Sequence, residues 1–243
     1  GTIFFSHCNM SCSYCQNYKF SQAEEGREVE FKELAAFMLE LQKKGCHNIN
    51  LVTPTHVMPQ ILKALIIAIK KGLKIPLVYN TSGYELPETI KMLEGIIDIY
   101  LADSRYGDKG MAIKYSHAPD YPKYNKESIK EMHRQVGIAK FNKEDIITNG
   151  LIIRHLVLPE GIAGTEKIMR FIAGKVSKDT YISLMSQYHP YHKAAGCKPI
   201  NRRISYQEYQ DARAIMEKYG LHNGWTQESG GLERLAGVYI KPL

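Results

Sequence analysis

The 243-residue chain has no long hydrophobic run and only five cysteines, and each scarcity argues against a class of protein. No stretch approaches the ~18 apolar residues that cross a membrane, because LIIAIKKGLKIPLV is interrupted by two lysines and a glycine. No secretory leader is visible, so the cysteines fit a reducing compartment better than a disulfide scaffold. We therefore expect a soluble, cytoplasmic protein that does not contact membranes.

Linker tracts and internal repeats are also missing. Without a Gly/Ser or Pro tract, and with 44% hydrophobic residues, residues 1–243 are expected to form one domain around one core. The formal charge is +7, but acidic residues interleave with the basic ones, as in FKELAAFMLELQKKG. This mixture is typical of solvated helix faces. We therefore expect a monomer that does not bind nucleic acid.

Three of the cysteines lie in one short loop, SHCNMSCSYCQN, as Cys8, Cys12 and Cys15. Thiolates with three and then two residues between them can hold three irons of a cubane 4Fe-4S cluster, whereas a fully protein-bound cluster needs a fourth cysteine. One iron would stay open to a substrate or cofactor. The loop, residues 7–18, therefore indicates a reaction centre rather than an electron wire, with the three cysteines as metal ligands and catalytic residues.

Other uses of the three cysteines remain open from the spacing alone. A zinc site could take His7 or a distant residue as its fourth ligand, although zinc sites usually pair two short knuckles and the chain has no second CxxC. A disulfide fits a clustered trio poorly. The alternative of a different class is a non-catalytic metal module, in which the trio only folds its own loop.

Short β-branched or aliphatic runs alternate with helical patterns along the chain, which predicts parallel strands joined by crossover helices. The predicted strands are residues 2–5, 48–52, 76–80, 97–101, 151–158 and 181–185. The predicted helices are residues 31–44, 59–71, 87–93, 126–136, 165–176 and 205–219. Six such units form an α/β fold, either a partial barrel or a strongly curved open sheet.

Both architectures place their chemistry at the carboxyl ends of the strands. All six predicted strands carry polar side chains at or just past this end. These side chains are His7, Thr53, Thr55, His56, Asn80, Thr81, Ser82, Asp103, Ser104, Arg105, Arg154, His155, Ser186, Gln187, Tyr188 and His189. Because the ends converge on the cysteine loop, they predict a binding site there.

The loop CNMSCSYC, with Tyr14 before its third cysteine, resembles the CxxxCxxC loop of the radical S-adenosylmethionine (SAM) superfamily. The segments NINLVTPTH, VYNTSGYE, DIYLADSRY, IIRHLVLP and SLMSQYHP are similar to a subgroup related to activating enzymes of glycyl-radical proteins, such as that of pyruvate formate-lyase. The resemblance implies a partial (β/α)6 radical SAM barrel with a 4Fe-4S cluster and SAM as cofactors. It also implies an oxidoreductase in which the reduced cluster cleaves SAM to methionine and a 5′-deoxyadenosyl radical that abstracts hydrogen.

The resemblance also assigns residues to the methionine part of SAM. Arg105, in the place of the lysine of a DxK motif, and Arg154 would hold the carboxylate, since a guanidinium offers a planar fork of donors. Asn80 and Ser82 would help to bind the amino group. Relatives pair an aspartate on the third strand with one on the fourth, in some cases around a monovalent cation. Here Asn80 replaces the first. Asp103 is still expected among the residues that bind the cofactor, but no cation is expected beside it.

The other parts of SAM fall to residues on the first, second, fifth and sixth strands. Tyr14 and Leu156 would flank the adenine, and His189, in QYHP, would contact the ribose. Many relatives carry a GGE motif after the second strand, where this chain reads Thr53, Pro54, Thr55 and His56. The hydroxyl and carbonyl of Thr53 could accept a proton of the amino group, but no carboxylate stands there.

The resemblance further implies a hydrogen donor and partners. The first expectation is a backbone glycine of a partner glycyl-radical protein, with a flavodoxin or ferredoxin as electron donor. The alternative within enzymes is radical chemistry on a small molecule or another macromolecule. Relatives commonly carry a segment before the first strand that this sequence does not show. The tail from about residue 220 to 243 is expected to cover the barrel or dock a partner.

Overall fold

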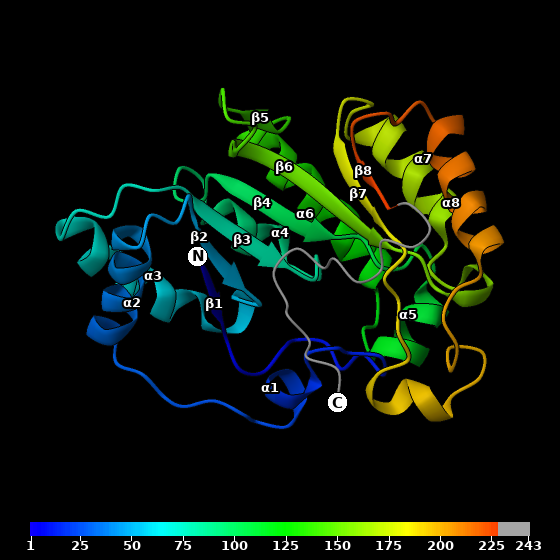
Figure 1. Ribbon diagram of the computed structural model, residues 1–243, viewed down its shortest axis with the longest axis horizontal. Helices are drawn as coiled ribbons and strands as arrows, with labels where there is room; N and C mark the ends of the chain where they lie inside the picture. Colours follow the sequence, from blue (N-terminus) through cyan, green and yellow to red (C-terminus); the bar gives the residue numbers. More distant parts are fainter. Residues whose placement is uncertain (228–243) are drawn as a thin grey trace.

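The computed structural model describes residues 1–227, and a mostly parallel sheet organises them (Figure 1). In spatial order the strands are β1 (Thr2–Phe4), β2 (Ile49–Val52), β3 (Leu77–Thr81), β4 (Ile99–Asp103), β6 (Ile147–Leu156), β7 (Tyr181–Met185) and β8 (Gly224–Thr226). Each neighbouring pair along this path runs parallel. The short strand β5 (Lys140–Phe141) lies off the path and pairs antiparallel with β6.

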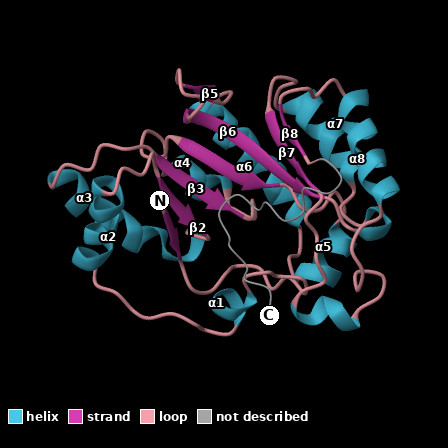
Figure 2. Cartoon of the chain, viewed as in Figure 1, coloured by secondary structure: helices cyan, strands magenta, loops and turns pink. Residues whose placement is uncertain are grey.

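Helices connect successive parallel strands and pack in neighbouring pairs outside the sheet (Figure 2). They are α1 (Tyr18–Gln22), α2 (Phe31–Lys43), α3 (Met58–Lys70), α4 (Pro87–Lys91), α5 (Lys109–Ser116), α6 (Tyr121–Val136), α7 (Thr165–Lys175) and α8 (Tyr206–Lys218). Short 3-10 turns occur at η1 (Thr55–Val57), η2 (Pro159–Gly161) and η3 (His192–Gly196). Because every crossover returns the chain in the same direction, the carboxyl ends of the parallel strands meet at one edge.

Helix α3 shows how the sequence sets this packing. The apolar residues Ile61, Ala64, Leu65 and Ala68 recur at helical spacing and are buried against the sheet. Ile69 follows Ile61 and Leu65 at the same helical spacing, but its side chain is 56% exposed. The small alanines carry the contact instead, which lets α3 pack closely on its neighbour α2.

The α/β fold predicted from the sequence is confirmed, with differences in several elements. Strand β8 is a seventh parallel strand in the predicted tail, where the three residues GWT are too short to give a strand pattern. Helix α6 begins at Tyr121, five residues before the predicted start, because Pro122 is tolerated in a first turn and Tyr121 and Asn125 are buried. Strand β6 begins at Ile147 and ends at Leu156, so it starts and ends earlier than predicted. Residues 228–243 of the predicted tail lie outside the described residues.

The buried apolar side chains form two separate clusters. The larger one fills the space between the sheet and its helices. The smaller one surrounds the cysteine loop and includes Met10, Cys12, Tyr14, Tyr106 and Tyr188. The cysteine loop therefore packs on a small hydrophobic core that is separate from the main one. Within the described part of the chain, no helix is long and apolar enough to cross a membrane.

Candidate functional site

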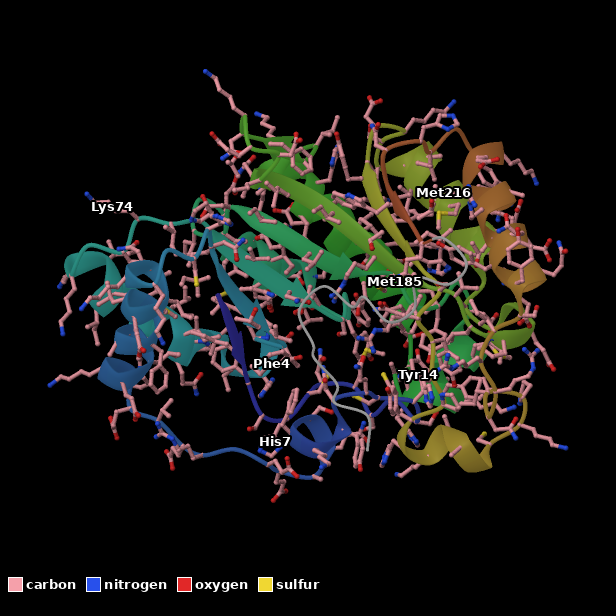
Figure 3. The ribbon with its side chains drawn as sticks, viewed as in Figure 1. Phe4, His7, Tyr14, Lys74, Met185 and Met216 are labelled. Atoms are coloured by element: carbon pink, nitrogen blue, oxygen red, sulfur yellow. The ribbon has the colours of Figure 1, made fainter. Side chains whose placement is uncertain are left out.

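The cysteine loop lies beyond the carboxyl ends of the strands and is fixed to α5. Figure 3 places His7 and Tyr14 on the side of the sheet toward which the strand arrows point. The backbone amides of Ser11 and Ser13 donate to the carbonyl oxygens of Ser116 and Tyr115 over 3.1 and 2.8 Å. Residues more than a hundred positions later in the sequence therefore set the path of this loop.

The three thiols differ in their surroundings. Cys12 is buried, with 3% of its surface exposed, whereas Cys8 and Cys15 are half-buried. Burial raises the pKa of the Cys8 thiol to about 11, and the neighbouring Cys12 and Cys15 add to the rise. The pKa of Cys12 is raised as well, again chiefly by burial and against the opposing effect of Arg105. Burial therefore favours the neutral thiols of Cys8 and Cys12 as long as no cation is bound, whereas a bound cation would deprotonate the thiols that coordinate it.

The donor set fits a cluster held through three of its corners. Three thiols come from one loop, and Cys8 and Cys15 reach the surface of the protein while Cys12 anchors the loop. Within residues 1–227, no three His, Cys, Asp or Glu side chains gather tightly enough to form a preformed site for a single metal ion. Thiolates are the protein ligands of iron-sulfur clusters.

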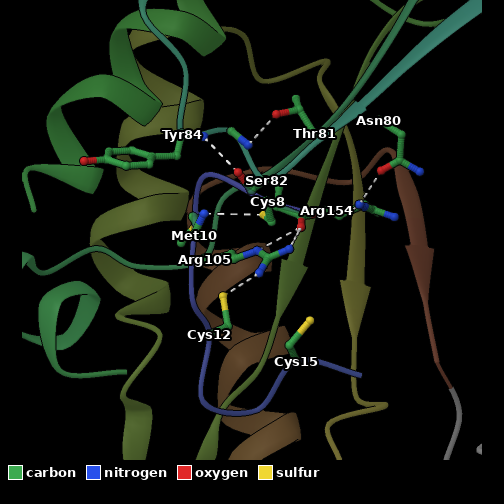
Figure 4. Close-up of polar contacts among 12 residues, drawn as sticks. Cys8, Met10, Cys12, Cys15, Asn80, Thr81, Ser82, Tyr84, Arg105 and Arg154 are labelled. Atoms are coloured by element: carbon green, nitrogen blue, oxygen red, sulfur yellow. Dashed lines mark hydrogen bonds and ion pairs between the residues drawn. The ribbon is translucent and has the colours of Figure 1, made fainter. Parts of the chain in front are cut away.

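A chain of charged and polar side chains runs from this loop across the strand ends (Figure 4). Arg154 on β6 lies opposite Asp103 on β4, and its Nε donates to Asp103 Oδ1 over 2.7 Å while its Nη2 donates to Asn80 Oδ1 over 2.7 Å. Arg105 donates to Asp103 Oδ2 from Nε and Nη2 over 2.9 and 2.6 Å. Its Nη1 donates to the Cys12 sulfur over 3.0 Å.

Asp103 thus has both carboxylate oxygens bound by guanidinium groups. Burial works to raise the pKa of Asp103, but Arg154 and Arg105 together hold it below its usual range. The carboxylate is therefore ionised at neutral pH and shares one negative charge between two positive groups. The excess positive charge lies at the strand ends, where it can attract an anionic part of a ligand.

A cleft opens beside the cysteine loop and this chain of charges. Its lining residues are Tyr14, Cys15, Gln16, Asn17, Asp103, Arg105, Arg154, Leu156, Met185, Gln187, Tyr188, His189 and Tyr191. Six of the residues predicted to hold SAM are among them, namely Tyr14, Asp103, Arg105, Arg154, Leu156 and His189. The structure therefore brings these six residues together beside Cys15.

The other three predicted cofactor residues lie outside the lining of this cleft. Asn80 turns its side-chain oxygen to Arg154, so it supports that guanidinium. The Ser82 hydroxyl donates to Asn9 Oδ1 over 3.5 Å, next to the cysteine loop. Thr53 has a φ of 59°, a strained backbone for a β-branched residue. Their proposed contacts with SAM stay predictions.

Two aromatic side chains form one wall of the cleft. Tyr14 and Tyr188 meet edge to face with ring centroids 5.6 Å apart. The Tyr14 hydroxyl is buried and accepts a hydrogen bond from Tyr106 over 2.7 Å, and Tyr106 also bonds Ser116 over 2.7 Å. This hydroxyl is therefore engaged behind the wall, and the ring is held in place as an apolar surface.

His189 lies on the same cleft with an unused polar atom. Its Nδ1 is buried and finds no hydrogen-bond partner among the described residues. The ring packs against Tyr191 in a tilted arrangement at a centroid distance of 4.5 Å. A buried polar atom without a partner is costly, so a ligand hydroxyl that bonds Nδ1 would be favoured.

The sequence offered no carboxylate where relatives carry the GGE motif, and the structure brings one there from the next strand. Glu85, which follows β3, accepts a hydrogen bond from Thr55 over 2.6 Å and another from Thr81. Its side chain is 2% exposed, and Oε2 has no partner among the described residues. Burial raises the pKa of Glu85 to about 7, although the Thr55 and Thr81 hydroxyls work to lower it.

We expect the stability of the protein to fall as pH rises through this range. The folded state holds the Glu85 proton up to about pH 7, whereas the unfolded state releases it near its usual 4.5. The stabilisation is therefore complete below about pH 4.5, declines as pH rises and is lost above about pH 7. The Glu85→Gln variant keeps a neutral side chain and should remove this slope, gaining about 3 kcal/mol over the unchanged protein at high pH.

Urea unfolding of both proteins between pH 4.5 and 8 measures this difference. The comparison cancels the titration of all other groups, because the two chains differ only at Glu85. Parallel stability curves for the two proteins would show that Glu85 is ionised throughout and would contradict the expectation.

His155, at the end of β6, is a structural residue. It is fully buried, and its ring nitrogens bond the Ser104 carbonyl over 2.7 Å and the Thr165 hydroxyl over 2.9 Å. Burial lowers the pKa of His155 to about 4, so the ring is neutral at physiological pH. This histidine joins the loop after β4 to the start of α7 and leaves the cleft to other residues.

Comparison with known proteins agrees with this arrangement. A family model described as the radical SAM superfamily matches residues 2–103, a span that holds the three cysteines and Asp103. This match covers less than half of the chain, and it shows a sequence similarity to that superfamily over the cysteine loop and the first four parallel strands. Members of this family bind a 4Fe-4S cluster and S-adenosylmethionine. The cysteine loop and the adjoining cleft are the parts of this chain that fit the two cofactors.

Relatives outside the family model extend the likeness over most of the chain. The chain is 32% identical over 230 residues to the uncharacterized protein MJ0674 of Methanocaldococcus jannaschii, and the match covers 90% of this chain and 62% of that protein. Methylornithine synthase (PylB) is similar in structure, with a TM-score of 0.56, 13% identity and coverage of 90% of this chain and 62% of that chain. The FeFe-hydrogenase maturase HydG from Carboxydothermus hydrogenoformans is also similar in structure, with a TM-score of 0.56 and 14% sequence identity. That match covers 96% of this chain and 55% of that chain.

The structural likenesses concern the fold alone, because their sequence identities are low. They support a partial radical SAM barrel, a mostly parallel α/β sheet with helices outside it. The names of these structures describe different tasks, so they do not confirm the subgroup of glycyl-radical activating enzymes. The chain spans about three fifths of the length of the curated relative that it matches.

Proposed function

We propose that this radical SAM protein cleaves SAM by one-electron reduction and uses the product to take a hydrogen atom from a glycine of a partner protein. The observation that carries the first part is the cleft that joins Cys15 to two guanidinium groups sharing one carboxylate. When bound, the cluster and SAM supply cleavage of a carbon-sulfur bond and abstraction of hydrogen.

The residues of the chain bind and orient SAM in this proposal. Cys8, Cys12 and Cys15 are the cluster ligands. Arg154 is the main grip for the carboxylate of SAM, because Asp103 and Asn80 use only its Nε and Nη2. A fixed guanidinium whose remaining N–H groups face a cleft binds a carboxylate strongly and in one orientation.

In this proposal the adenosine part of SAM lies against the wall of the cleft that contains Tyr14, Leu156 and His189. Tyr14 and Leu156 offer apolar surface for the adenine, and His189, which lines the cleft and whose Nδ1 has no partner among the described residues, would contact the ribose. The ordered walls position the reacting groups and exclude water, which protects a reactive product from side reactions.

The choice of a glycine as hydrogen donor rests on sequence resemblance and on the open sheet. In the described chain, β1 and β8 are the ends of the strand path, and each pairs with one neighbour on it. An open sheet gives a protruding loop of another protein a route to the strand ends. The net charge of +7 suits a partner with an acidic surface.

Two assays test the two parts separately. Anaerobic reconstitution with iron and sulfide, followed by dithionite and SAM, should yield 5′-deoxyadenosine and methionine. An intact 4Fe-4S chromophore without 5′-deoxyadenosine would contradict the SAM reaction. Adding the partner should then give the electron spin resonance doublet of a glycyl radical, and 5′-deoxyadenosine without a doublet would direct the search to a small molecule or another macromolecule.

Replacing His189 by alanine should weaken SAM binding without preventing cluster assembly. The loss of one buried hydrogen bond to the ribose costs about 1–3 kcal/mol, a drop in affinity of roughly five- to 150-fold. Equilibrium dialysis of SAM against the reconstituted protein measures it. His192→Ala is the matched control, since His192 stacks on Tyr18 and does not line the cleft. Equal affinities for the His189→Ala variant and the unchanged protein would remove His189 from the ribose contact.

A further inference from the structure

Arg105 uses all three of its guanidinium nitrogens on protein partners. Nε and Nη2 donate to Asp103 Oδ2, and Nη1 donates to the Cys12 sulfur over 3.0 Å. Figure 4 shows the Arg105 guanidinium above Cys12, with a dashed line that joins it to the Cys12 sulfur. Arg154 has a different set of hydrogen-bond acceptors, because its guanidinium donates to Asp103 and Asn80 and to no sulfur.

We propose that Arg105 is a positioning residue that holds the ligand sulfur of Cys12 and raises the reduction potential of the cluster. This inference rests on the proposed function, since it takes Cys12 as a ligand. The sequence resemblance assigned Arg105 to binding the SAM carboxylate, whereas this inference makes it a hydrogen-bond donor to a ligand of the metal centre.

The physical reason is the charge that the reduced cluster gains. A thiolate ligand carries negative charge, and reduction adds one electron to the group that it binds. A charged N–H donor at the sulfur stabilises the more negative, reduced state more than the oxidised state. Cys12 is buried and the Arg105 side chain is mostly buried, so water screens this interaction weakly.

The surroundings hold Arg105 in this position. Its backbone amide donates to the Tyr121 hydroxyl over 3.0 Å, and Tyr121 is fully buried. Asp103 fixes two of the side-chain nitrogens, and Arg154 fixes Asp103 from the other side. The direction of Nη1 toward sulfur is therefore set before a cluster binds, as expected of the groups that tune a metal centre from outside its ligands.

A redox titration of the reconstituted protein, without SAM, tests this role. The Arg105→Gln variant removes the charge, and its midpoint potential should be more negative. The ratio of oxidised to reduced cluster at a fixed potential should rise at least tenfold, which is 59 mV for one electron. Arg105→Lys keeps the charge without the fork and should shift the potential in the same direction by less. Arg202→Gln is the control, because Arg202 pairs with Glu208 on the surface.

The outcomes separate this inference from the proposed function. An unchanged protein that assembles no cluster would overturn both. An Arg105→Gln variant with a full cluster and an unaltered potential would overturn the inference alone. Should the glutamine variant fail to assemble a cluster, Arg105→Lys decides, since a negative shift supports the role and an unaltered potential contradicts it. Iron and sulfide content and the near-ultraviolet spectrum verify loading and folding of each variant.

Discussion

Replacing Cys12 by alanine should abolish both cluster assembly and SAM cleavage. Cys12 is the middle ligand of the three and the one that is buried, so its loss removes the ligand that is most shielded from solvent. Iron content after anaerobic reconstitution, together with 5′-deoxyadenosine formation, measures the loss. We expect both to fall to background.

The fold should survive this substitution. Cys12 packs with Tyr14 and Tyr106 in the smaller apolar cluster, apart from the main core. Removing one sulfur there should cost about 1 kcal/mol, and the larger cluster between the sheet and its helices is untouched. Cys46→Ala is the matched control, since Cys46 is half-buried between α2 and β2. Normal iron content in the Cys12→Ala variant would remove the trio from the mechanism.

Replacing Arg154 by alanine should have the largest effect on SAM affinity. The variant loses the guanidinium whose unused N–H groups face the cleft, and the SAM carboxylate is left without its partner. Truncating one member of a buried, hydrogen-bonded charge pair costs about 2–5 kcal/mol, a loss of about thirtyfold or more in affinity. Asp103 keeps Arg105 as a partner, so the carboxylate remains ionised and the strand ends remain ordered.

The lysine variant sharpens this test. Arg154→Lys keeps the positive charge but cannot span Asp103 and Asn80 at once, so it should restore part of the affinity. Calorimetry with the oxidised, reconstituted protein gives the dissociation constants of all three proteins. An alanine variant that binds SAM as tightly as the unchanged protein would place the carboxylate elsewhere.

Much of the fold and part of the site follow from the sequence for physical reasons. The spacing of Cys8, Cys12 and Cys15 is local, and a local pattern survives any tertiary arrangement. The alternation of apolar runs and amphipathic segments fixes the strand and helix order. The facing of Asp103 and Arg154 also follows, because neighbouring parallel strands bring their carboxyl ends together.

Other features depend on side-chain orientations that are set by tertiary contacts and not by the neighbouring sequence. Glu85 reaches Thr55 only because the chain turns back after β3, and Arg105 points to Cys12 only because Asp103 and Tyr121 hold it there. Strand β8 has three residues and no apolar period, so it forms through pairing with β7. A glutamate five residues after a strand end was the one sequence signal for the buried carboxylate.

The central claim is that three cysteine sulfurs leave one iron of the cluster open for SAM. The most direct measurement is the electron spin resonance spectrum of the dithionite-reduced, reconstituted protein during a titration with SAM. The account predicts a change in the g-values of the 4Fe-4S signal that saturates at one SAM per cluster. An intact cluster whose spectrum is identical at every concentration of SAM would contradict it.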